Sequence, residues 1–142
     1  MIEGVLITPL RIVDTPGGDV MHAMKKSDLG YDSFGEAYFS QVLCGAIKAW
    51  KRHRDMTLNL VVPSGEVRVV LYDDRDNRKV FQELTLSPFN YCRLTIPPMV
   101  WVGFQGLASK GSILLNIANL EHDPAESDRR EVNQIDYNWE TL

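Results

Sequence analysis

Lys51 and His53 stand two positions apart in the stretch GAIKAWKRHRDMTLNLVVPSG, residues 45–65. Side chains alternate between the two faces of a strand, so this pair shares one face if no bulge separates them. A histidine can take or return a proton near neutral pH. A lysine can hold an enolate oxygen as an ammonium, or act as a base if burial lowers its pKa. The pair therefore predicts acid–base chemistry, against the alternatives of a solvated edge lysine and a hydrogen-bonded structural histidine.

The residue spacing of the same stretch resembles the first signature of the cupin barrels, which bind metal through His, His and Glu. This chain has Lys51, His53 and Leu58 at those positions, and Val102 where the second signature has its last His. A protonated lysine repels a cation, and one of the usual four ligands remains. We therefore expect no metal at this site and no cofactor.

Size and charge narrow the classes of protein and of partner. The chain has 142 residues and a formal net charge of -4. This length is typical of a single domain, here residues 1–142, and the acidic balance argues against nucleic acid as a partner. No apolar run approaches the roughly 18 residues that a membrane span needs, and the sequence begins with no signal pattern. We expect no membrane partner and a cytoplasmic location.

The elements that must position the pair are short segments of alternating or β-branched residues, separated by Gly, Pro, Asp and Asn. This pattern predicts an all-β protein, and its roughly ten strands predict a double-sheet jelly roll. The expected strands are residues 4–13, 19–25, 36–43, 45–53, 56–62, 66–72, 80–86, 91–96, 100–107 and 112–120.

Three details of this layout bear on the site. Residues 56–62 and 66–72 are expected to form a hairpin through the turn Pro63-Ser64-Gly65. Pro9 interrupts the first strand, which suits an edge strand or one exchanged with a second subunit, because proline cannot donate to a ladder. The polar tail begins at about residue 121, and Tyr137 and Trp139 are expected to dock it on the body.

Longer motifs extend the likeness over nearly the whole chain. Residues 45–51 match Gly-Val-Leu-Arg-Gly-Leu-His, residues 65–75 match Gly-Glu-Val with an apolar run and Asp-x-Arg, and residues 94–104 match Ile-Pro-x-Gly-x-x-His-Gly-Phe. These motifs resemble the dTDP-4-dehydrorhamnose 3,5-epimerases and the related 3,4-ketoisomerases, which are metal-free cupins of nucleotide-sugar metabolism. The resemblance implies a cupin-type double-stranded β-helix and a homodimer that exchanges N-terminal strands.

The resemblance also implies an epimerase or isomerase of a nucleotide-linked 4-keto-6-deoxy sugar, acting in surface-polysaccharide synthesis. The catalytic histidine of the epimerases is Lys51 here, and His53 is the second histidine of the His-x-His of the ketoisomerases. The tyrosine acid of the family has no counterpart on the late strand, where Leu114, Leu115 and Asn116 stand. We predict that Lys51 and His53 are catalytic. By position, the predicted substrate-binding residues are Lys48, Tyr38, Asn59, Tyr72, Arg93 and Asn116.

Two alternatives remain open at this point. The departures from the family pattern are compatible with a catalytically inactive paralogue that binds a sugar nucleotide or regulates another protein. The retained His53 is compatible with a 3,4-ketoisomerase. The sequence leaves open which sugar and which nucleotide the protein would take.

Overall fold

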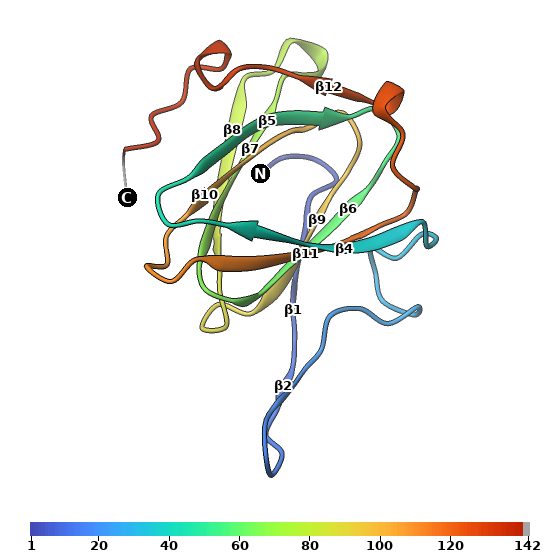
Figure 1. Ribbon diagram of the computed structural model, residues 1–142. Coiled ribbons are helices and arrows are strands. Elements are labelled where there is room, and N and C mark those ends of the chain that lie inside the picture. Colours follow the sequence, from blue (N-terminus) through green and yellow to red (C-terminus); the bar gives the residue numbers. More distant parts are fainter. Residues whose placement is uncertain (141–142) are drawn as a thin grey trace.

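The computed structural model describes residues 1–140, which fold into two five-stranded antiparallel sheets that face each other (Figure 1). The first sheet has the strand order β1-β9-β6-β11-β4, with β1 Leu6–Pro9, β9 Cys92–Ile96, β6 Leu58–Ser64, β11 Ser112–Ala118 and β4 Glu36–Val42. The second has the order β12-β5-β10-β7-β8, with β12 Ser127–Arg129, β5 Ile47–His53, β10 Trp101–Gly106, β7 Val67–Asp73 and β8 Val80–Leu86. This architecture confirms the predicted all-β jelly roll of the cupin type.

The remaining elements are short. Strands β2 (Ile12–Val13) and β3 (Val20–Met21) form a two-stranded ribbon that projects from the sheets (Figure 1). Three 3-10 turns are η1 Arg75–Asn77, η2 Pro124–Glu126 and η3 Val132–Gln134. Among residues 1–140, no helix has the length and apolar character needed to cross a membrane.

The hydrophobic core lies between the two sheets and follows the alternation of their strands. From β7, Val67, Val69 and Leu71 are buried in it, and Leu60 and Val62 of β6 belong to the same cluster. Alternation sends every second side chain of each strand inward, so these branched residues fill the interior between β6 and β7. The inward positions of β4, β5 and β11 carry more polar residues, and there the interior holds a cavity.

The outer face of the second sheet is covered by the C-terminal tail. Trp50 and Trp101 of this face pack with Ile135 and Trp139 in a buried cluster. The Trp50 and Trp139 ring centroids are 5.3 Å apart, and those of Tyr137 and Trp139 are 4.8 Å apart. The prediction that Tyr137 and Trp139 dock the tail is confirmed, and the covered face explains why β7 is apolar on both sides.

Removing the Trp139 side chain is expected to detach this tail. Trp139 is 6% exposed, and its ring lies against Gly103, where a Cβ atom would come within 2.9 Å of the ring. Trp139→Ala should therefore lower the free energy of unfolding by about 3–5 kcal/mol, the usual cost of truncating a buried tryptophan. Urea denaturation measures this value. Trp139→Phe should lose less, and an equal loss in both variants would contradict the packing role.

The predicted hairpin of residues 56–62 and 66–72 is wrong. β6 pairs with β9 and β11, whereas β7 pairs with β10 and β8, so the chain crosses from one sheet to the other at Gly65. Gly65 has a φ of 87°, and Ser112 packs directly against it. The Ser112 hydroxyl oxygen accepts a hydrogen bond from the backbone N–H of Glu66 at 2.9 Å. A Pro-Ser-Gly turn redirects the chain, but local sequence does not decide whether the next strand pairs or changes sheet.

The N-terminal strands are shorter than expected. The predicted strand over residues 4–13 is divided into β1 and β2, and the predicted strand over residues 19–25 is reduced to β3. In the first case the break follows Pro9, which ends the pairing of β1 with β9. The N–H of the next residue, Leu10, still donates to the carbonyl of Tyr91 at 3.0 Å, and β2 begins two residues later.

Candidate active site

A cavity of about 520 Å³ lies between the two sheets. Strands β4, β6 and β11 form one wall, β5 and β10 form the facing wall, and the C-terminal segment from β12 to η3 adds to the lining. The polar residues that line it are Tyr38, Ser40, Lys48, Lys51, His53, Asn116, Arg129, Arg130, Glu131 and Gln134.

Most of the residues predicted for the site come together in this cavity. Lys51 and His53 both line it, as the alternation along β5 predicts. Lys48 also lines it, and its amine donates to the carbonyl of Gln41 at 3.2 Å. Tyr38 and Asn116 reach it from the opposite wall.

Asn59, Tyr72 and Arg93 do not line the cavity. Each stands beside a leucine of the core on its strand, and alternation therefore turns it to the other face of its sheet. Those leucines are Leu60, Leu71 and Leu94.

Each of these three residues has structural contacts instead. Asn59 accepts a hydrogen bond from the Thr95 hydroxyl at 2.6 Å. The Tyr72 ring lies 4.6 Å from that of Phe81, between centroids. Arg93 is fully buried and donates to backbone carbonyls of the loop over residues 23–29. The sequence indicated the strands correctly but assigned the wrong face at these positions.

His53 is paired with a carboxylate, that of Glu126, which was not among the predicted site residues. Its Nδ1 lies 2.5 Å from Glu126 Oε1, and the two residues are 8% and 9% exposed. The other carboxylate oxygen of Glu126 accepts the backbone N–H groups of Asp55 at 3.1 Å and Met56 at 3.0 Å. Figure 1 shows the end of β5 next to the C-terminal segment that precedes β12, and these two elements carry His53 and Glu126.

The surroundings of Glu126 keep it ionised. Burial acts to raise the pKa of its carboxyl, but the hydrogen bonds from His53, Asp55 and Met56 outweigh burial and hold the pKa below its usual value. The ionised Glu126 accepts a hydrogen bond from the Nδ1–H of His53, and a neutral imidazole held in this way presents Nε2 as an acceptor. This is the arrangement of a general base oriented by a carboxylate.

Lys51 occupies the cavity beside another cation. It is the ladder partner of Arg129 of β12. Burial first, and then the charge of Arg129, lower the pKa of the Lys51 amine, while Glu126 and Glu36 act in the opposite direction. Within residues 1–140, no carboxylate forms an ion pair with this amine. The environment therefore favours the neutral amine more than water does.

Tyr38 places a hydroxyl on the wall opposite His53. Asn116 is its ladder partner, and Asn116 Nδ2 donates to the Tyr38 hydroxyl at 3.1 Å. The carbonyl oxygen of the Asn116 side chain accepts the backbone N–H of Asn59 at 3.2 Å, which orients the amide. Because its oxygen already accepts from Asn116, the Tyr38 hydroxyl can donate its own proton into the cavity. β4 thus supplies a tyrosine hydroxyl beside the late strand β11, which itself carries no tyrosine.

Sequence reasoning missed the contribution of the C-terminal segment. Glu126, Arg129, Arg130 and Glu131 all come from residues that the sequence presented as a polar tail. β12 pairs with the edge of β5 and so brings this charged run to the cavity. The cluster of charges was visible in the sequence, but its pairing with a strand more than 70 residues away was not.

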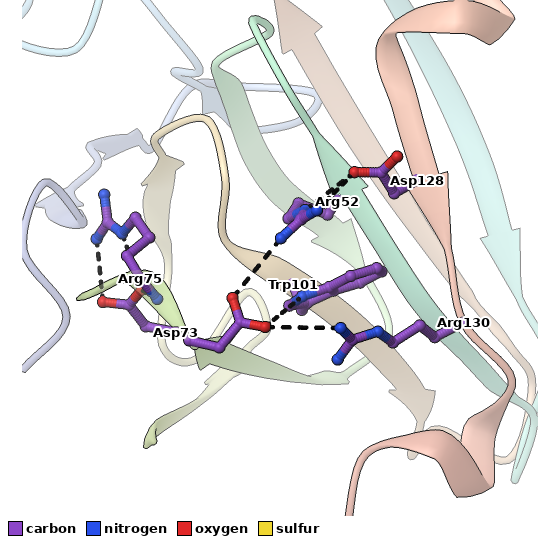
Figure 2. Close-up of polar contacts among 7 residues, drawn as sticks. Arg52, Asp73, Arg75, Trp101, Asp128 and Arg130 are labelled. Carbon is purple, nitrogen blue, oxygen red and sulfur yellow. Dashed lines mark hydrogen bonds and ion pairs between the residues drawn. The ribbon is translucent and has the colours of Figure 1, made fainter. Parts of the chain in front are cut away.

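The C-terminal segment is clamped to the outer side of the second sheet (Figure 2). Figure 2 shows Arg52 and Arg130 on opposite sides of the Trp101 ring, with guanidinium carbons 4.7 Å and 4.4 Å from its centroid. Asp74 lies between them, 3.6 Å from Arg52 and 3.7 Å from Arg130, and accepts the Trp101 indole N–H at 3.3 Å. Cation–π and ionic contacts of this kind fix the register of the segment that lines the cavity.

Asp128 fastens β12 to β5 on the same side. Its carboxylate accepts Arg54 at 2.5 Å and Arg52 at 2.7 Å, and these hydrogen bonds lower its pKa to about 2. Nearby, Arg75 binds Asp73 (Figure 2), and it also donates to the carbonyl of Glu3 at 2.7 Å. The Asp-x-Arg motif of the sequence therefore anchors the N-terminus and lies outside the cavity lining.

Few of the side chains that line the cavity are of the types that bind metal ions. Among residues 1–140, no three His, Cys, Asp or Glu side chains gather in a way that could hold one. Val102 lines the cavity where the cupin signature has its last histidine. A site without metal and without cofactor stays a prediction.

Two known proteins are similar to this chain in sequence. No protein-family model matches the chain. Over 100 residues, 68% of this chain, it is 28% identical to the probable low-salt glycan biosynthesis epimerase Agl13 of Haloferax volcanii, but it spans only 64% of that protein, less than two thirds. It is 26% identical over 148 residues to the spore coat polysaccharide biosynthesis protein SpsL of Bacillus subtilis, covering 99% of this chain and 98% of that one.

One solved structure is more similar. The crystal structure of a dTDP sugar isomerase from Desulfovibrio desulfuricans G20 superposes with a TM-score of 0.93 and is 37% identical in sequence. The match covers 97% of this chain and 92% of that chain. It therefore extends over both sheets and the C-terminal segment that completes the cavity.

Proposed function

Because the chain belongs to the dTDP-sugar isomerase family, we propose that it is an epimerase or isomerase of a nucleotide-linked 4-keto-6-deoxy sugar in surface-polysaccharide synthesis. The single observation that supports this most is the oriented His53–Glu126 pair, which shares its cavity with Lys51 and with the Tyr38 hydroxyl. A 4-keto sugar has acidic protons at C3 and C5. Moving them needs a base, a group that activates the carbonyl and an acid.

Each of these tasks has a residue in the cavity. Nε2 of His53 takes the proton from a carbon next to the carbonyl, and the ionised Glu126 stabilises the imidazolium that forms. Lys51, on the same strand face, activates the carbonyl group. Tyr38 returns a proton from the facing sheet. A base and an acid on opposite walls are what inversion at a carbon requires, because the proton must return to the other face.

The cations around the cavity fit the diphosphate of a sugar nucleotide. Lys48 and Arg129 both line it, in a protein whose net charge is -4. Guanidinium groups bind phosphate through paired hydrogen bonds, and each such bond to a charged group contributes about 1.5–3 kcal/mol. We assign the binding of the diphosphate to these basic side chains. Asn59, Tyr72 and Arg93 do not line the cavity and have no role in this binding site.

Arg129→Gln is expected to raise KM about tenfold or more while kcat changes less, because the lost contact acts on the non-reacting part of the substrate. Steady-state kinetics at two salt concentrations measures this. The KM of the variant should also depend less on salt than the KM of the wild type. Lys110→Gln, at an exposed loop position, removes a charge away from the cavity and serves as the matched control. An unchanged KM in Arg129→Gln would contradict the assignment.

The proposed function is tested by incubating the purified protein with dTDP- and GDP-linked 4-keto-6-deoxy sugars in deuterated water. We expect solvent deuterium at C3 or C5 of at least one of them, detected by proton NMR and mass spectrometry. If deuterium enters neither position of any of these sugars, the protein does not epimerise them.

Two measurements test the alternatives, a 3,4-ketoisomerase and a catalytically inactive paralogue, which the comparisons do not favour. His53 occupies the position of the second ketoisomerase histidine, so the place of the product carbonyl is informative. A carbonyl moved from C4 to C3 identifies a 3,4-ketoisomerase. Turnover that Lys51→Ala abolishes in a folded protein counts against an inactive paralogue.

A homodimer is part of the proposal. β1 is an edge strand of the first sheet, and the ribbon of β2 and β3 projects from the body (Figure 1). Apolar side chains on these strands are open to solvent, with Ile7 41%, Ile12 39% and Val20 50% exposed. Light scattering at micromolar concentration should give twice the 16.1 kDa mass of one chain, and a monomer mass would refute the dimer. The cytoplasmic location expected from the sequence stays a prediction.

A further inference from the structure

The Lys51 amine has the surroundings of a nucleophile. It lines the cavity, its ladder partner is the cationic Arg129, and among residues 1–140 no carboxylate pairs with it. Burial and the charge of Arg129 lower the pKa of this amine. A lysine that is desolvated and next to another cation is the type that attacks carbonyl carbons, because both influences favour the neutral amine, whose lone pair is the nucleophile.

We propose that Lys51 forms a Schiff base with the ketone carbon of the sugar substrate, so that the proton transfers take place on an imine. This inference rests on the proposed function, which supplies a ketone to the cavity. It assigns Lys51 a covalent role, in contrast to an ammonium that only contacts the carbonyl oxygen.

The step balances in atoms and electrons, with solvent water as the source and the acceptor of the protons that move during imine formation. The Nζ lone pair of Lys51 attacks the carbonyl carbon, and the carbonyl oxygen takes a proton. The resulting carbinolamine loses a proton from nitrogen, and its hydroxyl leaves with a further proton as water, which gives a protonated imine. His53 then takes the proton from the neighbouring carbon, and the electron pair of that C–H bond passes into an enamine. Return of a proton restores the imine, and water releases the ketone and the free amine with no net oxidation or reduction.

The spacing of Lys51 and His53 suits this sequence of steps. Two residues apart on one face of β5, their Cα atoms are about 7 Å apart, so both side chains can reach adjacent carbons of one sugar ring. A protonated imine withdraws electrons more strongly than a ketone, so it makes the neighbouring proton more acidic. The imine therefore supplies the electron sink that lets a single oriented histidine remove that proton.

The first test is reductive trapping of the full-length protein with dTDP-4-keto-6-deoxyglucose and sodium cyanoborohydride at neutral pH. We expect a mass gain equal to the substrate less one oxygen atom, mapped by peptide sequencing to Lys51. Lys51→Arg keeps the positive charge and should give no adduct at this position. Lys110→Arg, at an exposed loop position, should give the same adduct as the wild type. An adduct confined to other lysines overturns the proposal.

The second test needs no trapping reagent and separates this inference from the proposed function. Imine formation and hydrolysis exchange the ketone oxygen with solvent, so the wild type should accelerate ¹⁸O uptake from labelled water, and Lys51→Arg should not. Deuterium entering C3 or C5 without accelerated ¹⁸O uptake overturns the imine and leaves the proposed function standing. Accelerated ¹⁸O uptake with no deuterium at either carbon supports the imine and overturns epimerisation.

Discussion

Replacing His53 with asparagine is expected to lower kcat by about 10²–10⁴-fold, the usual contribution of a general base. Asparagine keeps a donor for the Glu126 carboxylate but cannot take the substrate proton. The buried hydrogen bond that holds the two segments together is thus largely preserved. KM should change much less than kcat, because the lost interaction forms only in the transition state. Steady-state kinetics of the keto-sugar reaction measures both constants.

A matched control is available in His122→Asn, because His122 is exposed and does not line the cavity. This variant should keep the wild-type kcat. Deuterium exchange at C3 and C5 should fall in parallel with kcat in His53→Asn. A folded His53→Asn protein with the wild-type exchange rate would show that another group removes the proton.

Glu126→Ala is expected to have the largest effect on stability among the polar residues of the site. The change leaves the buried His53 without its partner and the N–H groups of Asp55 and Met56 without their acceptor. Breaking a buried pair in this way costs about 3 kcal/mol or more. Urea denaturation at neutral pH measures the loss, and kcat should fall as well because the imidazole is no longer oriented. A variant as stable as the wild type would contradict the role given to this carboxylate.

The pH dependence of this contribution has a definite sign. The folded-state pKa of Glu126 lies below its usual value of 4.5, so the unfolded chain binds a proton more readily than the folded protein. The contribution is therefore fully present above about pH 5 and is lost as the pH falls through the folded-state pKa. The stability difference between the wild type and Glu126→Gln should accordingly shrink below pH 4.5. A difference that stays constant down to pH 3 would contradict the lowered pKa.

Much of the fold could be predicted because strands carry a local signal. The alternation of apolar and polar residues, with Gly and Pro between segments, indicated most strands of both sheets to within a few residues. It also placed Lys51 and His53 on one face of β5, and the cavity contains both. Where the inner and outer faces are both apolar, as in β7, alternation no longer identifies the face. Tyr72 was assigned to the pocket by its position in the chain alone, but it lies on the outer sheet face with Phe81.

The pairing of distant segments could not be predicted, because it depends on contacts that no local pattern encodes. Glu126 reaches His53 from 73 residues along the chain, and Arg129 reaches Lys51 only because β12 adds to the edge of β5. From the sequence, the segment after about residue 121 was expected to be a polar tail that Tyr137 and Trp139 dock on the body. Its docking was expected correctly, but the charges that it delivers to the cavity were not.

The amino-acid sequence by itself determined the all-β jelly roll, the shared face of Lys51 and His53, and the likeness to the keto-sugar enzymes. These follow from alternation and motif spacing, which act within a few residues. Only the tertiary structure decided that Glu126 orients His53, that Arg129 stands beside the Lys51 amine, and that Tyr38 faces them from the other sheet. The physical reason is that burial and proximity set the protonation and reactivity of a side chain, and both arise only when the two sheets and the C-terminal segment close around the cavity.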